Sequence, residues 1–173
     1  DGLSLDDSIL RLDSCQSRHL SFWSSVNTST KTTDASVLAT EQTQKLLKIF
    51  GSKPNMLICQ YNRAFSVGTL DLEVLPSGSV LGGASLYIEA FDQSLLYAPQ
   101  LFVQKVFNLR SLQLKKADVL LLKAPAPVQK NKAKERKQEV DRFLRRVEKD
   151  LLKGDHPLIL VPPFGLAQEL LGT

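Results

Sequence analysis

The stretch PSGSVLGGASL, residues 76–86, decides the fold because its glycines and serines separate two groups of strand-like apolar segments. Glycine adopts backbone conformations with positive φ that other residues avoid, so glycine clusters of this kind mark tight turns. Before the stretch, residues 64–67 and 69–75 predict a β-hairpin; after it, residues 84–91 and 95–97 predict a second one. We therefore expect a tight turn between two hairpins.

Further elements are predicted on both sides of these hairpins. Strands are expected at 8–12, 37–39, 56–59, 119–122 and 158–161, and helices after Thr40, within 140–151 and from Gly165. The run 119–122 is continuously apolar, which is typical of a strand buried on both faces. Residues 100–114 are expected to form an irregular link. Because hairpins come first and strand–helix–strand segments later, the sequence predicts the α/β (α+β) class, with a mixed sheet and helices outside it.

The composition is that of a globular protein. Its 173 residues, of which 43% are hydrophobic and 23% charged, predict one domain over residues 1–173. No apolar run approaches the roughly 18 residues of a membrane-spanning helix, and no signal peptide is visible, so we expect a cytoplasmic protein. The chain begins with Asp1, which indicates processing or an excerpt of a longer protein. Two histidines and two cysteines exclude a disulfide framework and a binuclear metal site built on imidazoles.

The positive charge is concentrated in one segment. Between Lys123 and Lys153 there are eleven Lys/Arg and five Asp/Glu, a local +6, whereas the whole chain carries +4 and the remainder therefore −2. The second half of the segment predicts a helix with an apolar stripe, and four cations fall mostly off that stripe: Arg142, Arg145, Arg146 and Lys149. A solvated outer face is the simpler interpretation. Nucleic-acid contact through these four side chains is the alternative, although no aromatic residue is interleaved with them.

Five stretches line up in order with one known family. They are SILRLDSCQSRHL (8–20), VLATEQTQKLL (37–47), LEVLPSGSVLGGASLYIEA (72–90) with LLYAPQ (95–100), ADVLLLKAPAP (117–127) and LILVPPFGLAQELL (158–171). Together they resemble the metallo-β-lactamase fold in its β-CASP branch. They are similar to DNA-ligase-associated exonuclease-like proteins and to exonuclease-like factors of messenger-RNA 3′-end processing. The resemblance implies an αββα sandwich, truncated or incomplete because the β-CASP cap that follows the last stretch is not in the chain.

The resemblance also places the family's metal-binding positions on this sequence. They fall on Ser14, Gln16, Arg18, His19, Ser79 and Gln100. Only His19 is a residue type that the family uses there, and Arg18 puts a cation where a carboxylate would bind a metal ion. A two-metal hydrolase needs carboxylate and imidazole ligands to hold both ions and to generate hydroxide near neutral pH. We therefore expect no metal and no other cofactor, although the resemblance implies zinc in active relatives.

A second chemistry is open at the same place. Cys15 and His19 are four residues apart, so on a helical turn they could face each other as a thiolate–imidazolium pair, with Asp13 orienting the histidine. The simpler interpretation is that Cys15 is a small buried residue and that His19 is left over from the lost metal site. Phe22 and Trp23 are expected to pack at the edge of the core.

Three functions remain open. The first is a catalytically inactive pseudo-hydrolase that acts as a protein-interaction scaffold in nucleic-acid processing, beside a protein partner or an active relative. The second is a nucleic-acid-binding module that uses residues 123–153. The third is an active metal-dependent nuclease or other hydrolase whose remaining ligands lie outside the chain. The replaced ligand positions favour the first, an inactive protein, and an incomplete sheet with open apolar edges also suggests self-association.

Overall fold

The computed structural model describes residues 3–6, 8–14, 19–26, 36–51, 55–103, 109–123, 133–162 and 164–171. The chain divides into two compact units, Asp1–Ala124 and Pro125–Thr173. The first unit contains all the described strands and one helix, and the second contains the other described helices. The single domain over residues 1–173 stays a prediction.

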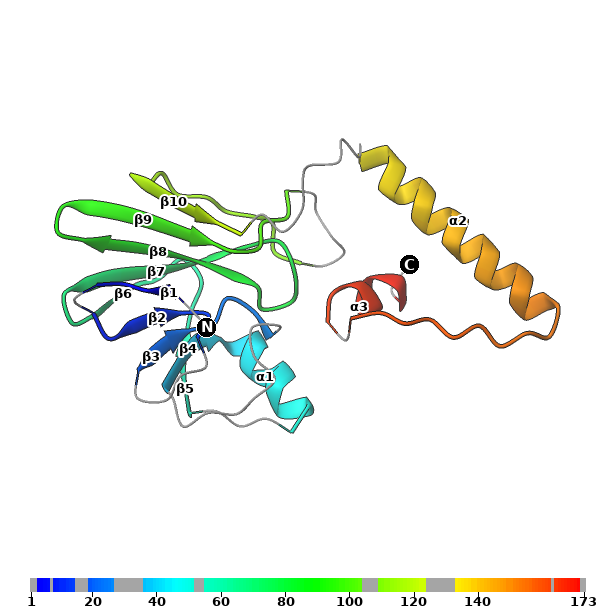
Figure 1. Ribbon diagram of the computed structural model, residues 1–173, viewed down its shortest axis with the longest axis horizontal. Helices are drawn as coiled ribbons and strands as arrows, with labels where there is room; N and C mark the ends of the chain where they lie inside the picture. The colour runs from blue at the N-terminus through cyan, green and yellow to red at the C-terminus, as the bar shows by residue number, and fades with distance from the viewer. Residues whose placement is uncertain are drawn as a thin grey trace. The chain divides into compact units, whose positions relative to one another are not determined.

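The first sheet consists of five short strands in sequence order. They are β1 (Leu3–Ser4), β2 (Leu10–Leu12), β3 (Leu20–Phe22), β4 (Ser36–Thr40) and β5 (Asn55–Cys59). β1 pairs antiparallel with β2, whereas β2 to β5 pair parallel to one another (Figure 1). The strands predicted at 8–12, 37–39 and 56–59 are confirmed. The sequence did not predict β1 or β3.

The second sheet is built from the two hairpins predicted on either side of residues 76–86. Its strands are β6 (Ala64–Val67), β7 (Leu70–Pro76), β8 (Ala84–Ala90), β9 (Gln93–Ala98) and β10 (Val119–Leu122), in the order β10-β9-β8-β7-β6. Both hairpins are confirmed, since β6 pairs antiparallel with β7 and β8 antiparallel with β9. β7 and β8 are also antiparallel, and β10 joins β9 in parallel. The carboxyl ends of β7, β9 and β10 therefore lie at one edge of the sheet.

The main hydrophobic core lies between the two sheets. Successive side chains of a strand point to opposite faces, so alternate residues of β2, β7 and β8 can meet on one side. Leu10 and Leu12 from the first sheet join Leu72, Val74 and Leu86 from the second in one buried cluster. None of these five side chains is more than 1% exposed. The predicted α+β sandwich is therefore confirmed.

One helix covers the first sheet. α1 (Glu41–Ile49) follows β4 directly and contacts β4 and β5 (Figure 1). Thr40 is its N-cap, and the Thr40 hydroxyl oxygen accepts a hydrogen bond from the Thr43 backbone N–H at 3.3 Å. Gly51, with φ of +78°, follows the last turn, where glycine is the residue that adopts this conformation most readily. The helix predicted after Thr40 is confirmed.

The outer face of the second sheet is covered by an irregular segment. The Lys115 ammonium lies 4.0 Å from the centre of the Tyr87 ring in β8 and 2.7 Å from the Glu73 carboxylate in β7. Leu101 and Ala117 pack against a small buried cluster on the same face. Within the described part of the first unit, α1 is the only α-helix. The second helical layer of an αββα sandwich is therefore not found among these residues.

Two predictions about apolar segments are wrong. Residues 119–122 form β10, but this strand lies at the sheet edge, and Val119, Leu120 and Leu122 are each about half exposed. Residues 158–161 form no strand, and Leu158 and Leu160 are 87% and 88% exposed. A strand needs a partner for its backbone N–H and C=O groups, and no described segment pairs with residues 158–161. An apolar run indicates a tendency to be buried, but burial also requires another segment that packs against it.

The second unit contains α2 (Ala133–Leu152) and α3 (Leu166–Leu171). Both helices are confirmed, although α2 begins earlier than the apolar stripe indicates. Gly154, at φ +84°, ends α2, and its N–H donates to the Leu151 carbonyl at 2.9 Å. The Gly165 N–H donates to the Gln168 side-chain oxygen at 2.7 Å at the start of α3. Among the described helices, none is long and apolar enough to cross a membrane.

Candidate functional site

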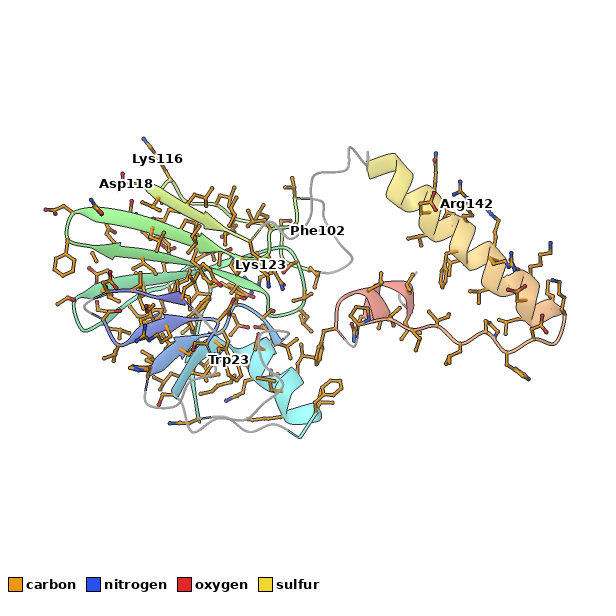
Figure 2. The ribbon with its side chains drawn as sticks, viewed as in Figure 1. Trp23, Phe102, Lys116, Asp118, Lys123 and Arg142 are labelled. Carbon is orange, nitrogen blue, oxygen red and sulfur yellow. The ribbon has the colours of Figure 1, made fainter. Side chains whose placement is uncertain are left out.

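Loops from both sheets meet at one edge of the sandwich. We call this the loop edge and define it as residues 13–14, 23–26, 77–83 and 99–102. The Ala84 N–H donates to the Ser24 carbonyl at 2.7 Å, which joins the start of β8 to the loop after β3. The Phe102 N–H donates to the Ser77 carbonyl at 3.1 Å, which joins the segment after β9 to the turn after β7. Figure 2 shows Phe102 at this edge, and Lys116 and Asp118 at the opposite end of the sheet.

The glycine-rich turn is confirmed and closed by its own backbone. The Ser77 N–H donates to the Gly83 carbonyl at 3.1 Å, and the Gly83 N–H donates to the Val80 carbonyl at 2.8 Å. Gly78 and Gly82 have φ of +71° and +80°, in the left-handed region that favours glycine. Glycine is therefore required at positions 78 and 82, because other residues rarely adopt this backbone conformation.

The turn is clamped to the start of α1. The Gly82 carbonyl accepts hydrogen bonds from the hydroxyls of Thr40 at 2.9 Å and Thr43 at 3.1 Å. The Tyr61 hydroxyl donates to the Gly83 carbonyl at 3.0 Å. Burial raises the pKa of Tyr61 above its ordinary value, so the phenol keeps the proton that this hydrogen bond uses. Three side chains from the first sheet, α1 and the loop before β6 thus hold two neighbouring carbonyls.

Asp13 forms the second network of the loop edge. Its backbone is in the left-handed region, with φ of +49°. One carboxylate oxygen accepts from the Ser24 N–H at 2.7 Å; the other accepts from the Ser24 hydroxyl and from the Tyr97 hydroxyl, both at 2.7 Å. Burial and the Asp13 carboxylate together raise the pKa of Tyr97. The carboxylate therefore links β2 in the first sheet to β9 in the second.

Sequence analysis missed this network. Asp13 was considered only as a group that orients His19, whereas its carboxylate bonds Ser24 and Tyr97. Tyr97 lies 84 positions along the chain from Asp13, so no local pattern connects the two residues. The one local signal for a turn at this position is an aspartate directly after a strand. Aspartate tolerates the left-handed backbone conformation better than most residues do.

The structure brings three of the six metal-site positions to the loop edge. Ser14 is buried after β2, and its carbonyl accepts from the Ser21 hydroxyl at 2.8 Å and from the indole N–H of Trp23 at 2.9 Å. The Ser79 hydroxyl lies 2.8 Å from that of Ser77 within the turn. Gln100 follows β9 and is half-buried. Trp23 and its neighbour Phe22 are buried, as predicted.

The structure does not bring His19 to the same place. β3 runs parallel to β2 with Leu20 level with Leu10, so His19 lies before the strand, beside Ile9. That position is about 13 Å from the loop edge, since Trp23 is four positions after His19 and each strand residue advances the chain by about 3.3 Å. Gln16, Arg18 and the proposed nucleophile Cys15 lie outside the described residues.

These side chains do not fit the binuclear metal centre that the family resemblance implies. Hydroxyl and amide groups stand at Ser14, Ser79 and Gln100, where the chemistry of such a centre needs imidazole and carboxylate. Among the described residues, no group of three or more His, Cys, Asp or Glu could hold a metal ion. Burial raises the pKa of the Cys59 thiol to about 11, so in the absence of a metal ion this cysteine stays protonated at neutral pH.

The four cations predicted for nucleic-acid contact lie along α2, all exposed. Arg142 pairs with Glu139 at 2.7 Å, and Arg146 with Asp150 at 3.1 Å. Arg145 and Lys149 form no ion pair with the described residues. Figure 2 shows the Arg142 side chain directed away from the helix axis. Exposed pairs of this kind are weak, so all four cations remain accessible to an anionic partner.

Comparison with known proteins shows a shared fold. No family model matches the chain. An uncharacterized protein of Synechocystis is 29% identical in an alignment of 153 residues. The match covers 78% of this chain and 26% of that protein. A protein of unknown function from Enterococcus faecalis has a TM-score of 0.54 and 13% identity over 75% of this chain and 39% of its own. A metallo-β-lactamase from Cronobacter sakazakii has a TM-score of 0.44 and 15% identity over 75% of this chain and 58% of its own.

The chain shares its fold with the Enterococcus protein. The fold of this chain is an α+β sandwich. The chain spans about a quarter of the length of the Synechocystis protein. The β-CASP branch stays a prediction.

Proposed function

We propose that this chain is part of a catalytically inactive, metallo-β-lactamase-like pseudo-hydrolase that acts through protein contacts. The observation that carries the proposal is the set of side chains at the loop edge. Ser14, Ser79 and Gln100 stand where the family resemblance implies metal ligands, and the turn that carries Ser79 is closed by its own hydrogen bonds. The backbone of a ligand-bearing turn is thus kept without ligands that could activate water.

Exposed apolar strands support a scaffold role. Half-exposed side chains line β10, and Leu57 and Ile58 are 55% and 42% exposed on β5. β10 and β5 are edge strands of their sheets. Open edges with apolar side chains are surfaces on which another strand or protein packs. We therefore propose a protein partner, which could be an active relative, a second copy, or further sequence of a longer protein, in the setting of nucleic-acid processing.

Metal content tests the proposal. We expect well below one zinc or manganese ion per chain when the protein is purified without chelator and its metals are measured by elemental mass spectrometry. Ser79→Ala should leave that value unchanged, because the Ser79 hydroxyl bonds Ser77 and binds no ion in this proposal. The measurement is made on this chain and on any longer natural protein that contains it, which is called the full-length protein below.

One or two ions per chain, lowered by Ser79→Ala, would contradict the proposal. Metal bound only by the full-length protein, together with hydrolysis of nucleic acid, would favour the alternative that the remaining ligands lie outside this chain. A metal-free full-length protein that hydrolyses neither nucleic acid nor β-lactam would support the inactive scaffold.

Nucleic-acid binding is the second candidate, and the exposed cations of α2 favour it. Arg145→Glu with Lys149→Glu should lower the affinity for single-stranded RNA and reduce the slope of log K against log salt by about 1 to 2, because each phosphate contact contributes about 0.7 to 0.9. The control is Lys45→Glu with Lys48→Glu, which makes the same charge change on α1. Filter binding across a salt series checks this. Equal slopes in both double variants would contradict the assignment to α2.

A further inference from the structure

A hollow of about 200 Å³ lies between the glycine-rich turn and the start of α1. The backbone of Gly78, Gly82 and Gly83 forms part of its wall. Gln42 from α1, Tyr61 and Arg110 add polar side chains, and Val80, Leu81 and Leu109 add apolar ones. All of these residues belong to the first unit. Ser14, His19, Ser79 and Gln100 are not among its described lining residues.

The wall of the hollow is held in place before any ligand arrives. The Gly82 carbonyl is held by two threonine hydroxyls, and the Gly83 carbonyl is held by the Tyr61 hydroxyl. A Cβ added at Gly82 would lie 2.6 Å from the Thr43 hydroxyl oxygen, so the turn packs closely against the start of α1. A pre-formed wall lowers the cost of ordering the site when a ligand binds.

Among the described residues of this wall, Arg110 supplies the only cationic group. Its guanidinium carbon lies 5.2 Å from the centre of the Tyr61 ring. A guanidinium carries five N–H donors, so a contact with one aromatic ring leaves donors for other partners. Arg110 forms no ion pair with any described residue. Its donors are therefore available to a ligand, as are those of the Gln42 amide at the same wall.

The acidic residue next to Gln42 in the sequence does not oppose an anion strongly. Glu41 lies beside Gln42 in the first turn of α1, and its carboxylate pairs with Lys45 at 2.7 Å. The cation of Lys45 offsets the charge of Glu41, whereas the charge of Arg110 is not offset among the described residues. A planar, uncompensated guanidinium matches the two oxygens of a phosphate group.

We propose that this hollow binds a phosphate oxyanion, with Arg110 as the bidentate donor and Gln42 as a second donor. The phosphate is either inorganic phosphate or the phosphate of a nucleotide, since both present the same oxygens. The site needs no metal ion, and it stands whether or not the scaffold proposal above is correct.

Titration calorimetry with three probes tests the inference: inorganic phosphate, adenosine monophosphate and adenosine. We expect saturable binding of the two phosphate-bearing probes and none of adenosine. Arg110→Gln should weaken phosphate binding at least tenfold, and Arg110→Lys should recover part of it, because lysine restores the charge without the fork. Arg63→Gln is the matched control, since Arg63 is exposed and its guanidinium bonds only Gln60 among the described residues.

Each outcome either supports or overturns the inference that the hollow binds phosphate. Tighter binding of adenosine monophosphate would support the inference with a nucleotide as the source, and equal binding would support it with free phosphate. Absence of saturable phosphate binding, equal affinity in wild type and Arg110→Gln, or equal weakening in Arg63→Gln would each overturn it. Unchanged urea midpoints of the Arg110 variants show that the fold is intact, because the exposed Arg110 lies outside the core.

Discussion

Gly82→Ala is expected to lower the free energy of unfolding by about 3 kcal/mol or more, which is among the largest effects of a single substitution. Its backbone has φ of +80°, where a residue with a side chain costs about 1 to 2 kcal/mol. The new Cβ would also lie 2.6 Å from the Thr43 hydroxyl oxygen and 2.7 Å from the Thr43 backbone nitrogen. The turn or the first turn of α1 must therefore move, and the threonine hydrogen bonds to the Gly82 carbonyl are lost.

Gly68→Ala is the matched control for this prediction. Gly68 has φ of +61°, but a Cβ at this position would meet no atom within 4 Å. The conformational cost is then present without the steric one, so we expect a loss of about 1 kcal/mol. Urea unfolding followed by circular dichroism measures both variants. Equal losses of unfolding free energy in the two variants would show that close packing of the turn against α1 does not contribute to the stability of the protein.

Asp13→Ala is expected to lower the free energy of unfolding by about 3 kcal/mol. The carboxylate accepts three hydrogen bonds at 2.7 Å, and each hydrogen bond to a charged group contributes about 1.5 to 3 kcal/mol, although such values do not add. Alanine leaves the Tyr97 hydroxyl and the Ser24 groups without this acceptor. It also has no side chain that favours the left-handed backbone of position 13.

Asp71→Ala provides the comparison, because the Asp71 carboxylate accepts one hydrogen bond, from the Ser66 hydroxyl at 2.6 Å, on the exposed surface. We expect a loss of less than about 0.5 kcal/mol there. Combining Asp13→Ala with Tyr97→Phe in a double-mutant cycle should give a coupling energy of about 1 kcal/mol or more. A coupling energy near zero would mean that the link between the two sheets does not stabilise the sandwich.

Local signals predicted most of the fold because the forces behind them are local. The hairpin around Gly68 follows from alternating side chains and a glycine turn, and α1 follows from the Thr40 cap and its apolar spacing. The strand predicted at 119–122 is confirmed, but its expected burial on both faces is wrong, and the strand predicted at 158–161 does not form. Burial of an apolar run depends on a partner elsewhere, and composition does not say whether the partner is there.

The metal-site positions stay a prediction, and the structure shows only where the described ones lie. Ser14, Ser79 and Gln100 were named from the order of motifs along the chain, and they meet at the loop edge because each follows a strand that ends there. His19 was grouped with them because the family motif that the resemblance implies includes both Ser14 and His19. The structure places His19 before β3, level with Ile9, at the other end of the parallel strands from Ser14, so closeness in sequence does not imply closeness in space here.

The sequence by itself determined the residue types at these positions, the turn, the hairpins, α1, and the scarcity of histidine and cysteine that limits metal chemistry. Only the tertiary structure decided that Asp13 bonds Tyr97, that Gly82 bonds Thr40 and Thr43, and that Arg110 lies over Tyr61 beside a hollow. Backbone preferences act between neighbours along the chain and can be read from a short stretch. Hydrogen bonds between sheets and the shape of a hollow depend on residues dozens of positions apart, which meet only once the two sheets have packed.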